Sequence, residues 1–301
     1  MQKYLFLLQL VVFFCLTEAA AQNSTTYELN EDFNDEEYAS RWSWLHDTEG
    51  WPDKVRKKEL TDGVLTLEMG TSGWFADKNA PFMYRTVTGD FDARTRIKAS
   101  GVNQDISETL WSLGGLMVRV PKPAKKDQWN PKEENWMFMT VGVAEEASKQ
   151  VIETKYTLNS KSNLKLRDAK AGWIILRIVR IGNAFLMLYK YDSDKTWTVH
   201  DRFYLVDWPQ TLQIGLNGYT NSNAVPPNIL WGDPFKFNNE SFDHLGKPDF
   251  KLSVDYVRIK KPAVNYNVPG NPGKQWLNQV YENRLVDYSL SNTELLKMVG
   301  E

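Results

Sequence analysis

The chain has 301 residues, with 36 Lys and Arg against 38 Asp and Glu, so its net charge is −2. This balance provides no positive field of the kind that binds nucleic acid or acidic lipid, and we expect no nucleic acid as a partner. Small basic clusters at 54–58 and 122–126 are interpreted as solvated loop charges rather than as a polyanion site.

The N-terminus has the features of a secretory signal peptide, which we assign to residues 1–21. Lys3 provides the positive charge, residues 4–16 form an apolar core, and residues 19–21 are small. The apolar core has about 13 residues, too few for a membrane span of about 20, and no later stretch is a candidate span. Cys15, the only cysteine, falls in this segment, so we expect a disulfide-free protein that is secreted, periplasmic or on a bacterial cell surface.

The rest of the chain is predicted to be mostly β-strand. In the run 172–180, Ile174, Leu176 and Ile178 share one face with a period of two, and a Gly-Asn pair at 182–183 predicts a hairpin. Many short strands separated by turn residues are typical of a β-sandwich or barrel. Strands are expected at residues 27–33, 64–69, 82–87, 91–99, 114–120, 136–143, 151–156, 163–166, 173–181, 184–191, 198–205, 212–218 and 250–260.

We interpret residues 22–261 as one β-sandwich domain and residues 262–301 as a C-terminal extension. Within the domain, residues 221–249 form a long loop rich in proline and aromatic residues, and such loops are either functional or packed on their own side chains. The extension ends in a helix predicted at 291–299, capped by one of its first two residues. It either packs against the sandwich, which we favour, or binds a partner.

Short motifs follow one another in a fixed order between residues 27 and 260. They are G-W-F at 73–75, G-D-F at 89–91, G-G-L-M-V-R at 114–119, N-W at 135–136, W-x-x-L-R-I-x-R at 173–180 and V-D-Y-V at 254–257. In this order they resemble the "regulation of enolase" family of concanavalin A-like β-sandwiches. The resemblance implies an all-β jelly roll of two antiparallel sheets with one concave face, in a superfamily whose members commonly bind glycans and in some cases hydrolyse them.

Aromatic residues are the first candidates for a ligand site in such a fold. All 12 Trp lie outside the signal peptide. A flat ring can bury the apolar C–H face of a sugar, because stacking does not order a long side chain. We predict that Trp74 and Trp136 stack on sugar and that Trp231 does so from a covering loop, while core packing is the alternative for each of them.

Arg119 is the fourth candidate binding residue, because it interrupts a strand of otherwise apolar residues. Its planar guanidinium could hold a pair of hydroxyl groups or a uronate carboxylate in a bidentate manner. The alternative is a structural ion pair with Glu145 or Asp92.

We assign no catalytic residue. Glycoside hydrolysis normally uses two carboxyl groups about 5 to 10 Å apart. Glucanases of this superfamily carry carboxylates at alternate strand positions, and only Asp90 and Asp92 come near that pattern. The three His have neither metal-ligand nor Ser-His-Asp spacing.

Sandwiches of this superfamily often hold a structural calcium near the chain ends. Asp32 and Asp255 are the candidate oxygen ligands, with turn capping as the alternative for Asp32, and we expect no other cofactor. The sequence thus predicts an exported, non-catalytic sandwich whose partner is an oligo- or polysaccharide. The alternatives are a glycoside hydrolase or polysaccharide lyase with an unrecognised site, and an envelope protein-interaction scaffold.

Overall fold

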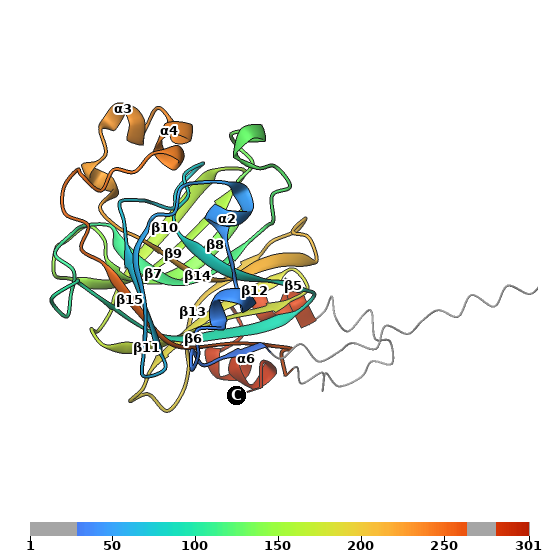
Figure 1. Cartoon of the computed structure of the whole chain (residues 1–301). Helices are drawn as coiled ribbons and strands as arrows, with labels where there is room; N and C mark the ends of the chain where they lie inside the picture. Colours follow the sequence, from blue (N-terminus) through green and yellow to red (C-terminus); the bar gives the residue numbers. More distant parts are fainter. Residues whose placement is uncertain (1–28, 264–280, 301) are drawn as a thin grey trace, which may run out of the picture.

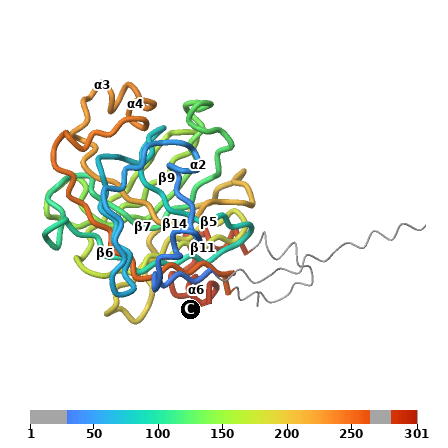
Figure 2. Tube along the Cα trace, viewed as in Figure 1, coloured from blue at the N-terminus to red at the C-terminus, as the bar shows by residue number. Residues whose placement is uncertain are grey.

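Alternation of apolar side chains along the strands produces two sheets that share one core. In the computed structural model, which describes residues 29–263 and 281–300, all strand pairs within the sheets are antiparallel and the sheets stack face to face (Figures 1 and 2). The signal peptide predicted at residues 1–21 lies outside the described residues. No described helix is long and apolar enough to cross a membrane.

The first sheet, called sheet A, has the strand order β13-β12-β11-β6-β15-β4-β3, and β1 also pairs with β15. Ile174, Leu176 and Ile178 of β11 face the core between the sheets, as the sequence predicts. The strands are β1 (Leu29–Glu31), β3 (Val55–Thr61), β4 (Val64–Met69), β6 (Phe91–Ser100), β11 (Trp173–Ile181), β12 (Ala184–Tyr191), β13 (Thr198–Tyr204) and β15 (Lys251–Lys260).

The second sheet, called sheet B, has the strand order β10-β9-β8-β7-β14-β5-β2. Its inner face meets sheet A, and its outer face carries the candidate site described below. The strands are β2 (Ser43–Trp44), β5 (Phe82–Thr88), β7 (Ser112–Arg119), β8 (Trp136–Val143), β9 (Gln150–Leu158), β10 (Lys161–Asp168) and β14 (Thr211–Tyr219). The predicted all-β sandwich of two antiparallel sheets is therefore confirmed.

Each predicted strand is present, but the alternation missed β2 and β3. In β3, four charged residues at 56–59 follow one another, so no apolar period is visible in the sequence. These charges are largely exposed on the edge of sheet A, where they hinder pairing with a second chain. The basic cluster at 54–58 was expected in a loop; the structure instead places most of it in this edge strand.

Short helices lie in the connections outside the sheets. The long loop at 221–249 contains two of them. The helix predicted in the extension is present, and a capping box of Ser291 and Glu294 begins it. The helices are α1 (Tyr38–Arg41), α2 (Leu45–Glu49), α3 (Pro227–Leu230), α4 (Pro234–Asn239) and α6 (Asn292–Met298).

The described part of the extension packs against the outer face of sheet A, as favoured from the sequence. Two arginines of that sheet hold its backbone: Arg177 donates to the carbonyl of Val299 (3.0 Å), and Arg202 donates to that of Leu290 (3.1 Å). In Figure 1, α6 lies on the opposite side of the molecule from α3 and α4. The apolar residues that form this contact are Val179, Ile181, Ala184, Leu186, Leu188, Trp197, Tyr281, Leu285, Leu290, Leu295 and Val299.

This packing predicts that the extension contributes to the stability of the whole sandwich. Leu295 is fully buried, so Leu295→Ala is expected to lower the free energy of unfolding by about 2 to 4 kcal/mol, measured by urea denaturation. Leu296→Ala, at the neighbouring half-buried position, is the matched control and should cost much less. Equal stability of wild type and Leu295→Ala would show that the extension does not unfold together with the sandwich.

Candidate functional site

The outer face of sheet B is rich in aromatic residues. Trp136 and Phe138 of β8 stack with ring centroids 5.1 Å apart, and Phe82 of β5 stacks on Tyr84 at 5.2 Å. All four rings are buried, because Leu45 of α2 and the segment at 70–81 pack on this face. The loop at 221–249 packs in turn against Phe75 of that segment. The face therefore meets solvent only where these covering segments leave a gap.

Trp74 and Trp136, both predicted to stack on sugar, belong to this buried layer. Their rings meet edge to face with centroids 5.5 Å apart, and both side chains are fully buried. A sugar ring cannot reach either face in this structure. Core packing, the alternative considered for each Trp, is the arrangement observed.

Arg119 is also fully buried on this face, in an ion-pair cluster. Its guanidinium donates two hydrogen bonds to Glu134 (both 3.1 Å), one to Glu49 (2.6 Å) and one to Gln213 (3.1 Å). Burial opposes the positive charge, but the two carboxylates outweigh it and raise the pKa of Arg119 above its ordinary value. The ion-pair alternative is thus observed, with partners that the sequence did not identify.

The partners predicted for Arg119 were wrong. Asp92 lies on the other sheet, where it pairs with Arg94 (2.8 Å) and Arg177 (2.9 Å), and Glu145 is exposed beside β8. Glu134 comes from the loop before β8, 15 residues after Arg119, and Glu49 comes from α2, 70 residues before it. Local spacing did not identify either of them.

A pocket of about 330 Å³ opens between β9, β10 and the loop at 221–249, and we call it the Trp231 pocket. Trp231 is 71% exposed at its rim, so one of the four predicted binding residues does reach solvent. Its ring lies 5.6 Å from that of Phe75, centroid to centroid. The lining residues are Gly73, Phe75, Trp111, Lys155, Ser162, Leu164, Tyr219, Ser222, Asn223, Leu230 and Trp231.

Polar groups converge beneath this pocket on the carboxylate of Glu153, which is fully buried in β9. Tyr219 and Thr140 donate hydrogen bonds to its Oε2, the latter at 3.1 Å, and the Nζ of Lys155 lies 2.7 Å from its Oε1. Burial and the adjacent carboxylate raise the pKa of Tyr219 well above its ordinary value, so this phenol remains a hydrogen-bond donor. Lys155 also donates to the backbone carbonyl of Trp74 (3.1 Å).

Lys155 and Glu153 were not among the predicted site residues, although their spacing in the strand carries a signal. The two residues are separated by one position in β9, so they point to the same face of the strand. Opposite charges at this spacing can pair across one face. Arg119 stood out because the rest of its predicted strand is apolar, whereas β9 also holds Gln150, Thr154 and Thr157.

The loop at 221–249 is held against the sandwich by hydrogen bonds to its backbone and side chains. The buried Lys54 donates to the carbonyl of Phe237 in α4 (2.6 Å), and Asn79 donates from its backbone to Asn238 (2.9 Å). Burial lowers the pKa of Lys54 to about 7, against the opposing effect of Asp243. The prediction that Lys54 is a solvated loop charge was therefore wrong.

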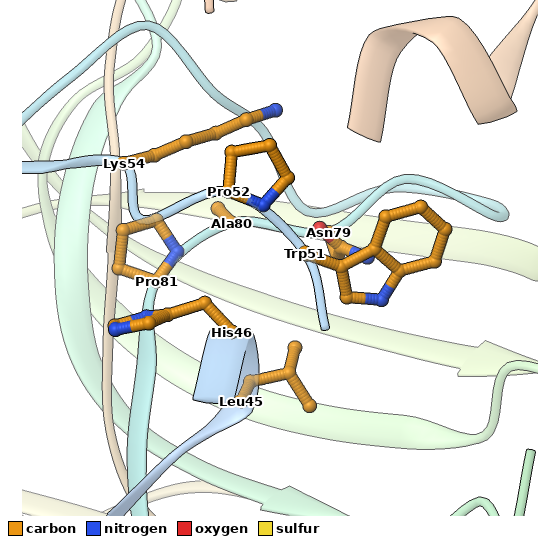
Figure 3. Close-up of a pocket in the computed structure, with 8 residues that line it drawn as sticks. All are labelled: Leu45, His46, Trp51, Pro52, Lys54, Asn79, Ala80 and Pro81. Atoms are coloured by element: carbon orange, nitrogen blue, oxygen red, sulfur yellow. The ribbon is translucent and has the colours of Figure 1, made fainter. Parts of the chain in front are cut away.

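A second hollow lies beside Lys54 (Figure 3). Leu45, His46 and Trp51 line it together with Pro52, Asn79, Ala80 and Pro81. Its volume of about 10 Å³ is room for one water molecule. It is too small for a ligand, so the Trp231 pocket is the better candidate.

The residues considered for calcium are engaged with arginines. Asp32 accepts a hydrogen bond from Arg258, and Asp255 pairs with Arg96 (3.0 Å). Within residues 29–263 and 281–300, no group of three or more His, Cys, Asp or Glu is arranged to hold a metal ion.

Comparison with known proteins finds solved structures of similar fold but does not assign the chain to a family. No family model and no curated protein matches the chain. A Saccharomyces cerevisiae protein of unknown function is similar over 74% of this chain and 97% of its own, with 15% identity and a TM-score of 0.51. A GH43 protein from Bacillus licheniformis, BlXynB, is similar over 77% of this chain, with 12% identity and a TM-score of 0.51.

This chain spans only 39% of the length of BlXynB. Winged bean acidic lectin, solved with methyl-α-D-galactose, is similar over 79% of this chain and 99% of its own, with 12% identity and a TM-score of 0.47. At these identities, the likeness to the yeast protein and to BlXynB shows a shared fold and nothing further.

Burial separates the tryptophans into two groups that mutation should distinguish. Trp136→Ala removes a fully buried ring and is expected to lower the free energy of unfolding by about 3 to 5 kcal/mol in urea titrations. Trp231→Ala removes an exposed ring and should change it by about 0.5 kcal/mol or less. A stable Trp136→Ala variant would contradict the packing described for this face.

The lowered pKa of Lys54 predicts a rise of stability with pH. Its ordinary pKa is 10.5, so between pH 7 and 9 the unfolded chain binds more protons than the folded chain, and the free energy of unfolding increases. We expect this contribution to be about 2 kcal/mol between pH 7 and 9. Lys54→Met should lack this contribution. If urea titrations gave the same pH dependence for the two proteins, the pKa of Lys54 would not change on folding, and the prediction would be wrong.

Proposed function

We propose that the protein binds carbohydrate in the Trp231 pocket without cleaving it. The observation that carries this proposal is the convergence of Phe75, Trp111 and Trp231, from three separate segments, on a pocket with a polar floor. Aromatic faces suit the C–H faces of a sugar, and the Ser and Asn side chains at the rim can exchange hydrogen bonds with its hydroxyl groups. The volume of about 330 Å³ lies at the lower end of the range of ligand pockets.

Two further features support a sugar as the ligand. The fold is shared with BlXynB, whose GH43 designation places that protein among enzymes of carbohydrates, although the likeness extends to the fold alone. The order of sequence motifs resembles the "regulation of enolase" family, and membership of that family remains part of this proposal. Export directed by residues 1–21 is also proposed, and it would place the site outside the cytoplasm.

The absence of catalysis is proposed from the residues around the pocket. Among the described residues that line it, none is Asp or Glu. Glu153 lies beneath the floor and is occupied by Tyr219, Thr140 and Lys155. Hydrolysis would need two carboxyl groups flanking a glycosidic bond, which this arrangement does not offer.

The test is an array of oligo- and polysaccharides probed with the mature protein, with the release of reducing ends measured in the same wells. Wild type should bind at least one glycan and release no reducing ends. Trp231→Ala should weaken this binding at least about tenfold, because stacking on an aromatic ring is lost.

Tyr288→Ala is the matched control. Tyr288 is 72% exposed, as Trp231 is, but it lies in the extension on the other side of the sandwich. This variant should bind like wild type. Equal binding by wild type and Trp231→Ala would exclude the pocket as the binding site, and release of reducing ends would show that the site is catalytic.

A further inference from the structure

Lys155 is the one charged residue among the described residues that line the Trp231 pocket. Its ammonium and the carboxylate of Glu153 lie 2.7 Å apart, and both side chains are almost completely buried. At the position of a ligand in the pocket, the electric fields of the ammonium and the carboxylate largely offset each other. A bound molecule therefore meets a polar but uncharged floor.

Arg119, the cation that the sequence predicts to bind a ligand, is neutralised by carboxylates in the same way. Arg119 lies between the carboxylates of Glu134 and Glu49, with no solvent-exposed surface. Lys122, also near this cluster, lies 3.3 Å from Glu134. Lys78 is 4.4 Å from the ring centroid of Phe75, and it does not line the pocket.

We infer that the Trp231 pocket takes an uncharged sugar residue and discriminates against uronates and sulfated sugars. This inference rests on the proposed function and adds the class of ligand. An anion that enters the pocket loses its hydration. The Lys155–Glu153 pair has no net charge, so its attraction for the anion is too weak to offset this loss. A hydroxyl group loses much less hydration and finds matching partners.

Lys155 still has one hydrogen-bond donor for such a ligand. An ammonium group has three N–H bonds, of which one is directed to the carbonyl of Trp74, and allowing a second for the carboxylate of Glu153 at 2.7 Å leaves the third. The third can donate to a hydroxyl or ring oxygen of the sugar. Aromatic rings of Trp111, Phe138 and Tyr219 lie 5.4 to 5.6 Å from the Nζ and hold the ammonium in place.

The first test compares sugars that differ only in the group at C6, which is neutral in one form and anionic in the other. Cello-, manno- and galacto-oligosaccharides are each offered beside their C6-oxidised forms, in which carboxylates replace the hydroxymethyl groups. Wild type should bind a neutral member at least about tenfold more tightly than its oxidised form, with little dependence on ionic strength.

The outcomes of this comparison separate the two proposals. Tighter binding of the oxidised form, lost in Trp231→Ala, would overturn the inference and leave the proposed function intact. Binding of no glycan, in this comparison or in the array, would overturn the proposed function, and the inference with it.

The second test removes the compensating charge. In Glu153→Gln, the side chain retains its length and an acceptor for Tyr219, while the ammonium of Lys155 loses its counterion. The preference for neutral sugars should fall at least about tenfold, and binding of the oxidised forms should become sensitive to salt.

The double variant Glu153→Gln with Lys155→Met is the matched control, since its floor is again uncharged. It should regain the preference for neutral sugars, and circular dichroism of each variant verifies folding. An unchanged preference in a folded Glu153→Gln protein would show that the ion pair does not set the selectivity.

Discussion

The aromatic outer face of sheet B imposes the constraint on which the other features of this protein depend. A sandwich needs only its two inner faces for a core, but here the outer face of sheet B also carries a buried apolar cluster, built mainly from β5, β7 and β8 and joined by Tyr219 of β14. Each large apolar side chain removed from water contributes about 1.5 to 3 kcal/mol, so the face is stable only when it is covered. Helix α2, the segment at 70–81 and the loop at 221–249 provide that cover, and the Trp231 pocket is the gap that remains.

Buried polar groups determine how these covering segments pack on sheet B. Arg119 links β7 to α2 through Glu49 and to the loop before β8 through Glu134, while Lys155 links β9 to the backbone at Trp74. Buried ion pairs contribute little net stability after desolvation, but they disfavour arrangements that would leave a charge unpaired. In this protein, we interpret them as determinants of where each covering segment lies. The same pairing neutralises the positive charge of Arg119 and Lys155 on the outer face of sheet B.

The sequence predicted the sheets well because their signal is local. Alternation over six to ten residues identified nearly every strand, and failed at β3, whose consecutive charges serve an exposed edge. The site was predicted less well, because it depends on contacts between distant segments. A Trp has the same local signature whether a loop covers it, as at Trp74, or leaves it open, as at Trp231. Glu49, one of the partners of Arg119, likewise comes from a segment 70 residues away that only the fold brings close.

The packing of the C-terminal extension against sheet A affects the order in which the protein folds. Arg177 and Val299 are 122 residues apart, and Arg202 and Leu290 are 88 residues apart, so these contacts close long loops. Contacts of such separation are slow to form. Until these contacts form, β11, β12 and β13 expose a broad apolar face. Exposed apolar surface of this kind promotes aggregation of partly folded chains. The last twenty residues of the described chain thus cover an apolar face of sheet A, and we expect slower docking to leave a newly made molecule prone to aggregation for longer.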